Sequence, residues 1–191
     1  MTSPSTIEDE TNWLGGFYEL AIELDPPDDA RLDETLKVMW RTAGASGPFA
    51  GYRDGTYRPV ALSVESLLEH GHLRGVVDAP GFGSVVCGAV AIRCVDGDHD
   101  WLAFYLPLGA LERADVRVGG YPFGQYEATP LWRPPLDAWL ASIGERVHEA
   151  IPFARANVGM ESVGEDSEFD GHLLPTAGGL TYVPGRMEAT T

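Results

Sequence analysis

The sequence predicts an α+β fold, a single domain in which a largely antiparallel sheet carries two main helices on one face. Three observations predict this class. The chain opens with a strand followed by a helix, its middle holds three strands joined by short turns, and it closes with a helix followed by a strand. The expected order is β-α-(β)-α-β-β-β-loop-α-β. The 191 residues, 44% of them hydrophobic, suit one domain of ordinary size.

The first strand is expected over residues 17–24, where apolar side chains alternate with Glu19 and Glu23. Two prolines follow, and the first main helix is expected at about 28–43. Its apolar residues recur at spacings of four and three, and it ends near Gly44.

Residues 44–62 are rich in glycine, tyrosine and arginine and are expected to be irregular, with one short edge strand near 57–62. A short helix should follow from Ser63, which caps it, to His70. Gly71 is placed to end this helix.

A meander of three strands comes next, at residues 73–78, 84–95 and 101–106. The turns between them contain Gly, Pro and Asp residues, as tight turns require. The middle strand alternates poorly between apolar and polar residues, which indicates a strand covered on both faces or central in the sheet.

Residues 107–135 show no clear period apart from a short helix over 108–114. The second main helix is expected at about 135–151, where apolar residues recur at spacings of four, three, four and four. A last strand is expected over 153–160. The prediction is therefore a globular domain over 13–160.

Two flanking segments complete the chain. Residues 1–12 are polar and acidic and are expected to form a flexible tail. Residues 161–191 are expected to be mostly irregular, with apolar patches at 173–174 and 180–183.

The charge of the chain is unevenly distributed. The formal net charge is −16, from 29 acidic and 13 basic residues. Residues 1–40 carry a net of −8 and residues 161–191 a net of −5, whereas the 120 residues between them carry −3. This acidity disfavours nucleic acid and anionic membrane as partners and favours a basic protein.

No secretory signal and no apolar run long enough for a transmembrane helix is found in the sequence. Cys87 and Cys94 lie in one expected strand, too far apart for a disulfide. Reduced thiols indicate a cytoplasmic protein.

One segment begins like a calcium-binding loop. Asp166, Glu168 and Asp170 stand at positions one, three and five, and a glycine follows at six. The twelfth position holds Ala177 instead of glutamate, and Pro175 interrupts the helix that an EF-hand needs. We therefore interpret the segment as a solvated acidic loop, and we expect no metal and no cofactor.

Two further metal motifs are weaker. His70 and His72 have the spacing of some zinc ligands, but no third ligand can be identified. The acidic turn at 96–100 is explained by hairpin geometry.

The remaining candidate is the aromatic loop at 119–135, which proline stiffens. It contains Tyr121, Phe123, Tyr126 and Trp132. Long loops of this kind are typical of binding sites, and aromatic rings supply large contact areas. The alternative is that these rings cover an open face of the sheet.

No nucleophile elbow or phosphate-binding loop is present in the sequence. In size, acidity and α+β pattern the chain resembles small acidic bacterial immunity- or inhibitor-type proteins. The leading hypothesis is therefore a non-enzymatic, cytoplasmic protein-binding domain that engages a basic partner through acidic surface. The alternative is a small-molecule-binding protein or enzyme with a pocket under the loop 119–135. The sequence leaves the oligomeric state open.

Overall fold

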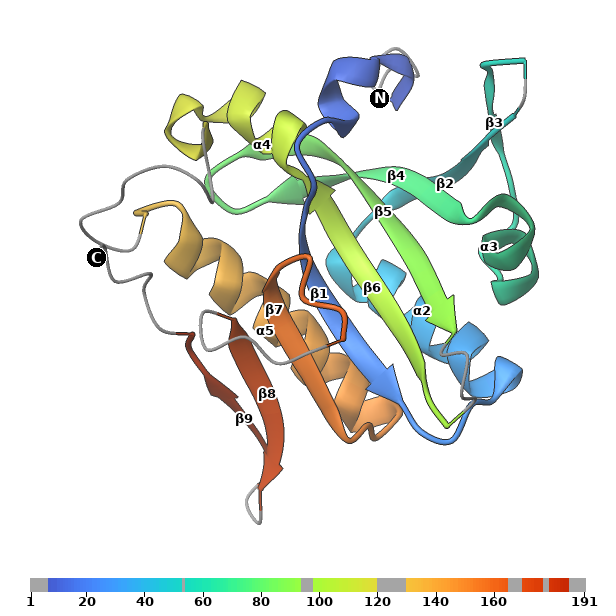
Figure 1. Cartoon of the computed structure of the whole chain (residues 1–191), viewed down its shortest axis with the longest axis vertical. Coiled ribbons are helices and arrows are strands. Elements are labelled where there is room, and N and C mark those ends of the chain that lie inside the picture. Colours follow the sequence, from blue (N-terminus) through green and yellow to red (C-terminus); the bar gives the residue numbers. More distant parts are fainter. Residues whose placement is uncertain are drawn as a thin grey trace.

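The fold is built on one antiparallel sheet of nine strands, backed by helices (Figure 1). It was obtained as a computed structural model, which describes residues 7–52, 54–93, 98–119, 130–164, 170–176 and 179–185. The predicted α+β class is confirmed.

The elements follow one another along the chain without repeats. They are η1 (Glu10–Trp13), β1 (Phe17–Leu24), α2 (Asp29–Ala43), β2 (Ser46–Gly51), β3 (Tyr57–Pro59), α3 (Val64–His70), β4 (His72–Ala79), β5 (Gly83–Arg93), β6 (Asp100–Pro107), α4 (Leu108–Ala114), η2 (Val116–Val118), α5 (Arg133–Ala150), β7 (Arg155–Met160), β8 (Gly171–Thr176) and β9 (Gly179–Val183).

The strands are ordered β3-β2-β4-β5-β6-β1-β7-β8-β9, and each strand within the described part of the chain pairs antiparallel with its neighbours. Strands β6 and β1 occupy the middle, while β3 and β9 form the two edges (Figure 1). The meander β4-β5-β6 was predicted, and β5 lies inside the sheet as its poor alternation indicated.

Local signals in the sequence set the bounds of the two main helices. The side chain of Asp28 accepts hydrogen bonds from the first turn of α2, and Gly44 ends that helix in the left-handed region at φ 70°. Prolines occupy the first turn of α5, where their missing N–H groups cost nothing. Both helices lie on the same face of the sheet, as expected (Figure 1).

Strand β2 is a correction to the sequence analysis, which expected an irregular segment and one edge strand there. β2 pairs with both β3 and β4, and its register shifts between Ser46 and Phe49. Glycine and proline inside this strand mask its period, because neither has high strand propensity.

Two more departures occur at the flanks. The apolar patches expected within an irregular segment at 161–191 pair with each other as the hairpin β8–β9, which extends the sheet beyond β7. At the other end, Ile7 is buried and its carbonyl accepts a hydrogen bond from Nε1 of Trp13 at 2.8 Å. The acidic segment expected to be a flexible tail therefore packs against the fold from Ile7 onward.

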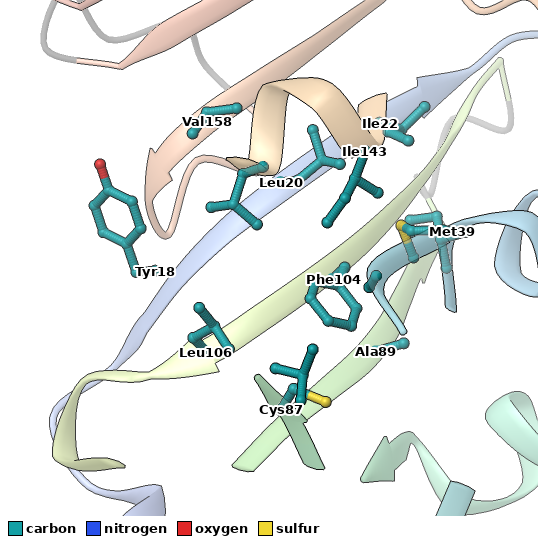
Figure 2. Packing of buried hydrophobic residues seen from close by; sticks show 14 of the residues in the cluster. Tyr18, Leu20, Ile22, Met39, Cys87, Ala89, Phe104, Leu106, Ile143 and Val158 are labelled. Atoms are coloured by element: carbon teal, nitrogen blue, oxygen red, sulfur yellow. The ribbon is translucent and has the colours of Figure 1, made fainter. Parts of the chain in front are cut away.

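The main core lies between the sheet and the helices α2 and α5. In Figure 2, Leu20 and Ile22 of β1 and Phe104 of β6 lie on the sheet side of this core, facing Ile143 of α5 and Met39 of α2. Tyr18 lies near the start of β1, with its hydroxyl at the margin of the cluster.

A smaller apolar cluster covers part of the opposite side of the sheet. It joins Ile7 to Val76 of β4, Val86 of β5 and Ala110 of α4. Helix α4 and η1 lie together at one end of the sheet (Figure 1). The middle of β1 is fully buried, whereas Tyr18, near the start of β1, lies in a polar cluster.

Candidate functional site

A polar cluster is buried where β1 meets the start of α5. Arg133 and Asp137 lie one helical turn apart on α5 and are only 5% and 8% exposed. Residues four apart share one side of a helix, so both side chains point toward the sheet. There they meet Tyr18, which is fully buried. Charged residues are rarely buried to this degree, which distinguishes the cluster from the apolar core around it.

One hydroxyl group links the three side chains. Tyr18 donates its hydroxyl hydrogen to Oδ1 of Asp137, and the same oxygen accepts a hydrogen bond from Nε of Arg133 at 2.9 Å. The distance from Nε of Arg133 to Oδ2 of Asp137 is 3.8 Å, so the two charges also pair directly.

Opposing effects act on the pKa of the Asp137 carboxyl. Burial raises the pKa of this carboxyl above its ordinary value, while the hydrogen bond from Tyr18 and the positive charge of Arg133 act in the other direction. A buried ion pair seldom adds net stability, and perturbed carboxyls concentrate at functional sites. The cluster is therefore the strongest candidate site among the described residues.

A cavity of about 210 Å³ opens beside this cluster, between the start of α5 and the end of β9. Its described lining consists of Arg133, Pro134, Asp137, Ala138, Tyr182, Pro184 and Gly185. The two prolines, the alanine and the ring of Tyr182 form apolar walls, and the ion pair forms the polar end.

Tyr182 approaches the sheet closely. Its hydroxyl lies over Gly171, where any Cβ would collide with the phenol oxygen, so only glycine fits at this position. The hydroxyl is buried and makes no hydrogen bond with the described part of the chain. Burial raises the pKa of Tyr182, and the negative charge of Asp137 adds to the effect.

Trp132 is the only one of the four predicted aromatic residues that the structure describes. It is 3% exposed and immediately precedes α5, with its ring edge-on to Tyr18 at a centroid distance of 5.3 Å. Phe82 lies on another side at 6.2 Å. Trp132 therefore packs against the Tyr18 ring of the cluster. Tyr121, Phe123 and Tyr126 lie outside the described residues.

The described lining places hydrogen-bonding groups next to apolar surface. None of its residues is a serine, cysteine or histidine. What it offers instead is one hydrogen-bond donor group and one acceptor group side by side, next to apolar surface. Such an arrangement suits recognition of a compact molecule.

A larger cavity of about 470 Å³ lies elsewhere, between η1, α4 and the start of β5. The charged residues on its rim are Asp9 and Arg113, which pair with each other at 2.5 Å and are substantially exposed. Because these groups already neutralise each other in contact with solvent, this cavity offers less to a ligand than the buried cluster does.

Of the three predicted metal candidates, the structure describes Asp170 alone. Asp166 and Glu168 lie outside the described residues, and Asp170 is 7% exposed, with its carboxylate over Gly159. Within the described ranges, no group of three His, Cys, Asp or Glu residues is arranged to hold a metal ion. His72 is instead hydrogen-bonded through Nδ1 to the hydroxyl of Tyr105 at 2.9 Å.

The charge separation along the sequence is reduced in space by three ion pairs. Three arginines from the nearly balanced middle of the chain form ion pairs with acids of the N-terminal segment. The pairs are Asp9–Arg113, Glu23–Arg155 and Asp29–Arg93. Three of the ten acids in residues 1–40 are therefore paired with arginines from the middle of the chain.

Comparison of the chain with protein-family models, curated proteins and solved structures found no significant match. The site is accordingly defined by its own geometry. Among the described helices, none has the length and apolar character needed to cross a lipid bilayer.

Sequence reasoning did not identify Tyr18, Arg133, Asp137 or Tyr182 as site residues. A signal for two of them is present in the sequence. Arg133 and Asp137 continue the stripe of Leu140, Gly144 and Val147 at helical spacing, and charged residues on the buried stripe of a helix need a specific partner.

Proposed function

We propose that this chain binds a compact small molecule in the cavity between the start of α5 and the end of β9. The observation that carries the proposal is the buried Arg133–Tyr18–Asp137 network in contact with a cavity. Burying two charges is costly, and a cavity lined by both of them is the usual setting of a ligand site.

The shape and charge of the cavity limit its ligand. A volume of about 210 Å³ is below the range of roughly 300–1,000 Å³ typical of drug-sized ligands, so the ligand is small. The polar end combines a guanidinium with a carboxylate, so a ligand of either net charge would meet one like charge. A neutral hydroxyl or amide group, which both donates and accepts, fits this end better.

The experiment is a thermal-shift screen of the full chain with small neutral alcohols, amides and ureas. A binding compound should raise the melting temperature, because a ligand that binds only the folded chain stabilises it. Asp137→Asn should reduce this shift, whereas Glu34→Gln on the exposed side of α2 should leave it unchanged. A panel without any shift, or a shift equally present in Asp137→Asn, would contradict the proposal.

A second candidate function is binding of a basic partner protein, in the manner of an immunity or inhibitor protein acting in the cytoplasm. The net charge of −16 supports it. So do the exposed acids Glu65, Glu145 and Glu149 on the helical side, which form no ion pair with other described residues. Such acids attract a cationic surface and accelerate its association.

This second proposal predicts a salt-dependent complex. A basic protein retained by the chain should bind at least tenfold more weakly at 0.5 M than at 0.05 M salt, because screening shortens the range of the acidic field. Combined replacement of Glu65, Glu145 and Glu149 by glutamine should produce a similar loss. Binding that is insensitive to both changes would argue against the acidic surface as the contact.

A further inference from the structure

The two edges of the sheet differ in how well they are protected against pairing with another chain. Strand β3 forms one edge, and its three residues include Arg58 and Pro59. Short length, charge and proline are features that keep an edge strand from pairing further. Strand β9 forms the other edge, and its five residues (GLTYV) contain neither a charged residue nor a proline. The β9 edge is therefore the one that can accept a further strand.

The register of the β8–β9 hairpin determines which backbone groups of β9 face outward. Leu180 lies opposite Pro175. Proline has no N–H to donate, so this is a non-hydrogen-bonded pair of the antiparallel ladder. Because the two kinds of pair alternate, Thr181 directs its N–H and C=O toward β8, whereas Leu180 and Tyr182 direct theirs toward the free edge. Two backbone donors and two acceptors thus face outward from the middle of β9.

The side of this edge that faces α5 is apolar and only partly covered. The side chains of Leu180 and Tyr182 lie on this side, half-buried and packed against the main core. Beside them, Ala138 of α5 and the ring of Tyr182 line the same cavity. An added strand would place every second side chain next to Leu180 and Tyr182 and extend the core by one strand. This side therefore favours apolar residues at alternate positions of an incoming segment.

Acidic residues of α5 lie beyond this apolar surface. Glu145 and Glu149 follow Ala138 by seven and eleven residues, spacings that return to the same side of a helix. Both are exposed, and neither forms an ion pair with another described residue. A Lys or Arg that flanks the apolar residues of an incoming segment would find an opposite charge there. The net charge of −16 adds a long-range attraction for such a segment.

We propose that the β9 edge binds an extended segment of a basic partner protein, which joins the sheet as a further strand. The segment pairs its backbone with Leu180 and Tyr182, and its alternate apolar side chains cover the surface beside α5. Its flanking Lys or Arg residues meet Glu145 and Glu149. Main-chain hydrogen bonds supply the affinity of such contacts, and the side chains supply the specificity. This inference rests on the second candidate function and gives it a place and a mode of contact.

The first test measures hydrogen exchange of the full chain with a synthetic peptide in which valine alternates with threonine and lysines flank both ends. The amides of Leu180 and Tyr182 should gain about tenfold or more protection, because they acquire acceptors only when a strand is added. The amide of Thr181, which faces β8, should change less. A peptide that does not bind, or that binds without protecting Leu180 and Tyr182, overturns the proposal.

Two modified peptides separate the backbone contact from the charge. A peptide that is N-methylated at alternate residues, on the amides that would face β9, should bind about tenfold more weakly, because it cannot donate to the outward carbonyl groups. Replacement of the lysines by glutamates should cause a similar loss, because like charges then face Glu145 and Glu149. Equal binding of the N-methylated peptide would overturn strand addition. Equal binding of the glutamate peptide would overturn the assignment of a basic partner.

A pair of variants tests the edge from the side of the protein. Leu180→Pro removes an outward N–H that β8 does not use, which an edge strand tolerates, and Leu180→Ala is the matched control that keeps this N–H. Leu180→Pro should bind the lysine peptide about tenfold more weakly than Leu180→Ala does. Circular dichroism establishes that both variants fold, and the N-methylated peptide with wild type decides the question if Leu180→Pro does not. A basic protein that binds in a salt-dependent manner, and equally well to both variants, would leave the second candidate function standing and overturn the β9 edge as its contact.

Discussion

The hydroxyl of Tyr18 donates a hydrogen bond to Oδ1 of Asp137 across a sequence separation of 119 residues. The bond joins a central strand to the first turns of α5. Because Nε of Arg133 donates to the same hydroxyl at 2.9 Å, one oxygen atom is hydrogen-bonded to both buried charges. Removal of this atom is therefore expected to affect more than one interaction.

Tyr18→Phe should destabilise the chain by about 1–3 kcal/mol. The ring remains in place, but Asp137 loses its donor and Arg133 loses an acceptor inside the protein. Urea denaturation of wild type and variant would measure the difference. A variant as stable as wild type would show that the network does not contribute to folding.

Tyr182→Phe is the matched comparison at the same cavity. The hydroxyl of Tyr182 is buried and makes no hydrogen bond within the described part of the chain. Its removal should therefore leave the free energy of unfolding within about 0.5 kcal/mol of wild type, or raise it. A loss as large as that expected for Tyr18→Phe would reveal a hydrogen-bond partner for Tyr182.

Elements with a clear period could be predicted from the sequence. The strand expected at 17–24 is β1 residue for residue, and the helices expected at 28–43 and 135–151 agree with α2 and α5 to within two residues. Apolar side chains recur in these elements because one side of each is buried, so the period of the element is visible in the sequence. Capping residues then define the ends.

Elements stabilised by distant partners could not be predicted in this way. Strand β2 contains Gly47 and Pro48, and it is a strand because β4 and β3 pair with it on both sides. The hairpin β8–β9 likewise joins the sheet by pairing with β7, which ends at Met160, whereas β8 begins at Gly171. In both cases tertiary pairing overrides weak local propensity.

The site was predicted only in part, for the same reason. Aromatic composition pointed to the loop at 119–135, and Trp132 does lie against the cluster. The polar members of the cluster come from β1 and α5, far apart in the sequence, and no local motif connects them. Their contact is a consequence of the fold.

Two arginines allow the contributions of an exposed and a buried ion pair to the free energy of unfolding to be compared. The Arg155–Glu23 pair is mostly buried, and the Arg155 guanidinium lies 5.3 Å from the ring centroid of Trp101. Arg155→Met should therefore cost about 1–2 kcal/mol. The Arg93–Asp29 pair is largely exposed, so Arg93→Met should cost less than about 0.5 kcal/mol. Equal losses in denaturation experiments would show that burial does not distinguish the pairs.

Gly75→Ala should disrupt the contact between β4 and α2. A Cβ at this position would collide with the backbone oxygen of Ser46 and would lie 2.6 Å from Cζ2 of Trp40. Neither neighbour can move without shifting β2 or the core, so we expect a loss of about 1–3 kcal/mol. Ser84→Ala, at the exposed start of β5, provides a control. A variant with the melting temperature of wild type would show that β2 and Trp40 can shift to accommodate the added methyl group without loss of stability.

The stability of the chain is expected to have a maximum in mildly acidic solution. Hydrogen bonds from Arg117 hold the pKa of Asp115 below its ordinary value, and such carboxylates lose their stabilising effect as acid protonates them. Glu19 acts in the opposite direction, since burial raises its pKa from 4.5 to about 7. Asp137, whose pKa burial also raises, acts in the same direction as Glu19.

The sign for Glu19 follows from proton linkage. A folded chain with a raised carboxyl pKa binds more protons than the unfolded chain between pH 4.5 and 7, so its stability falls as the pH rises through this interval. The expected loss for Glu19 is about 3 kcal/mol, at 1.36 kcal/mol per pKa unit. Urea denaturation of wild type at pH 5, 6, 7 and 8 should show a steady decrease. Glu19→Gln should remove most of this decrease, because an amide does not titrate. A wild-type chain that is equally stable at pH 5 and pH 8 would mean that Glu19 is ionised, and compensated, throughout.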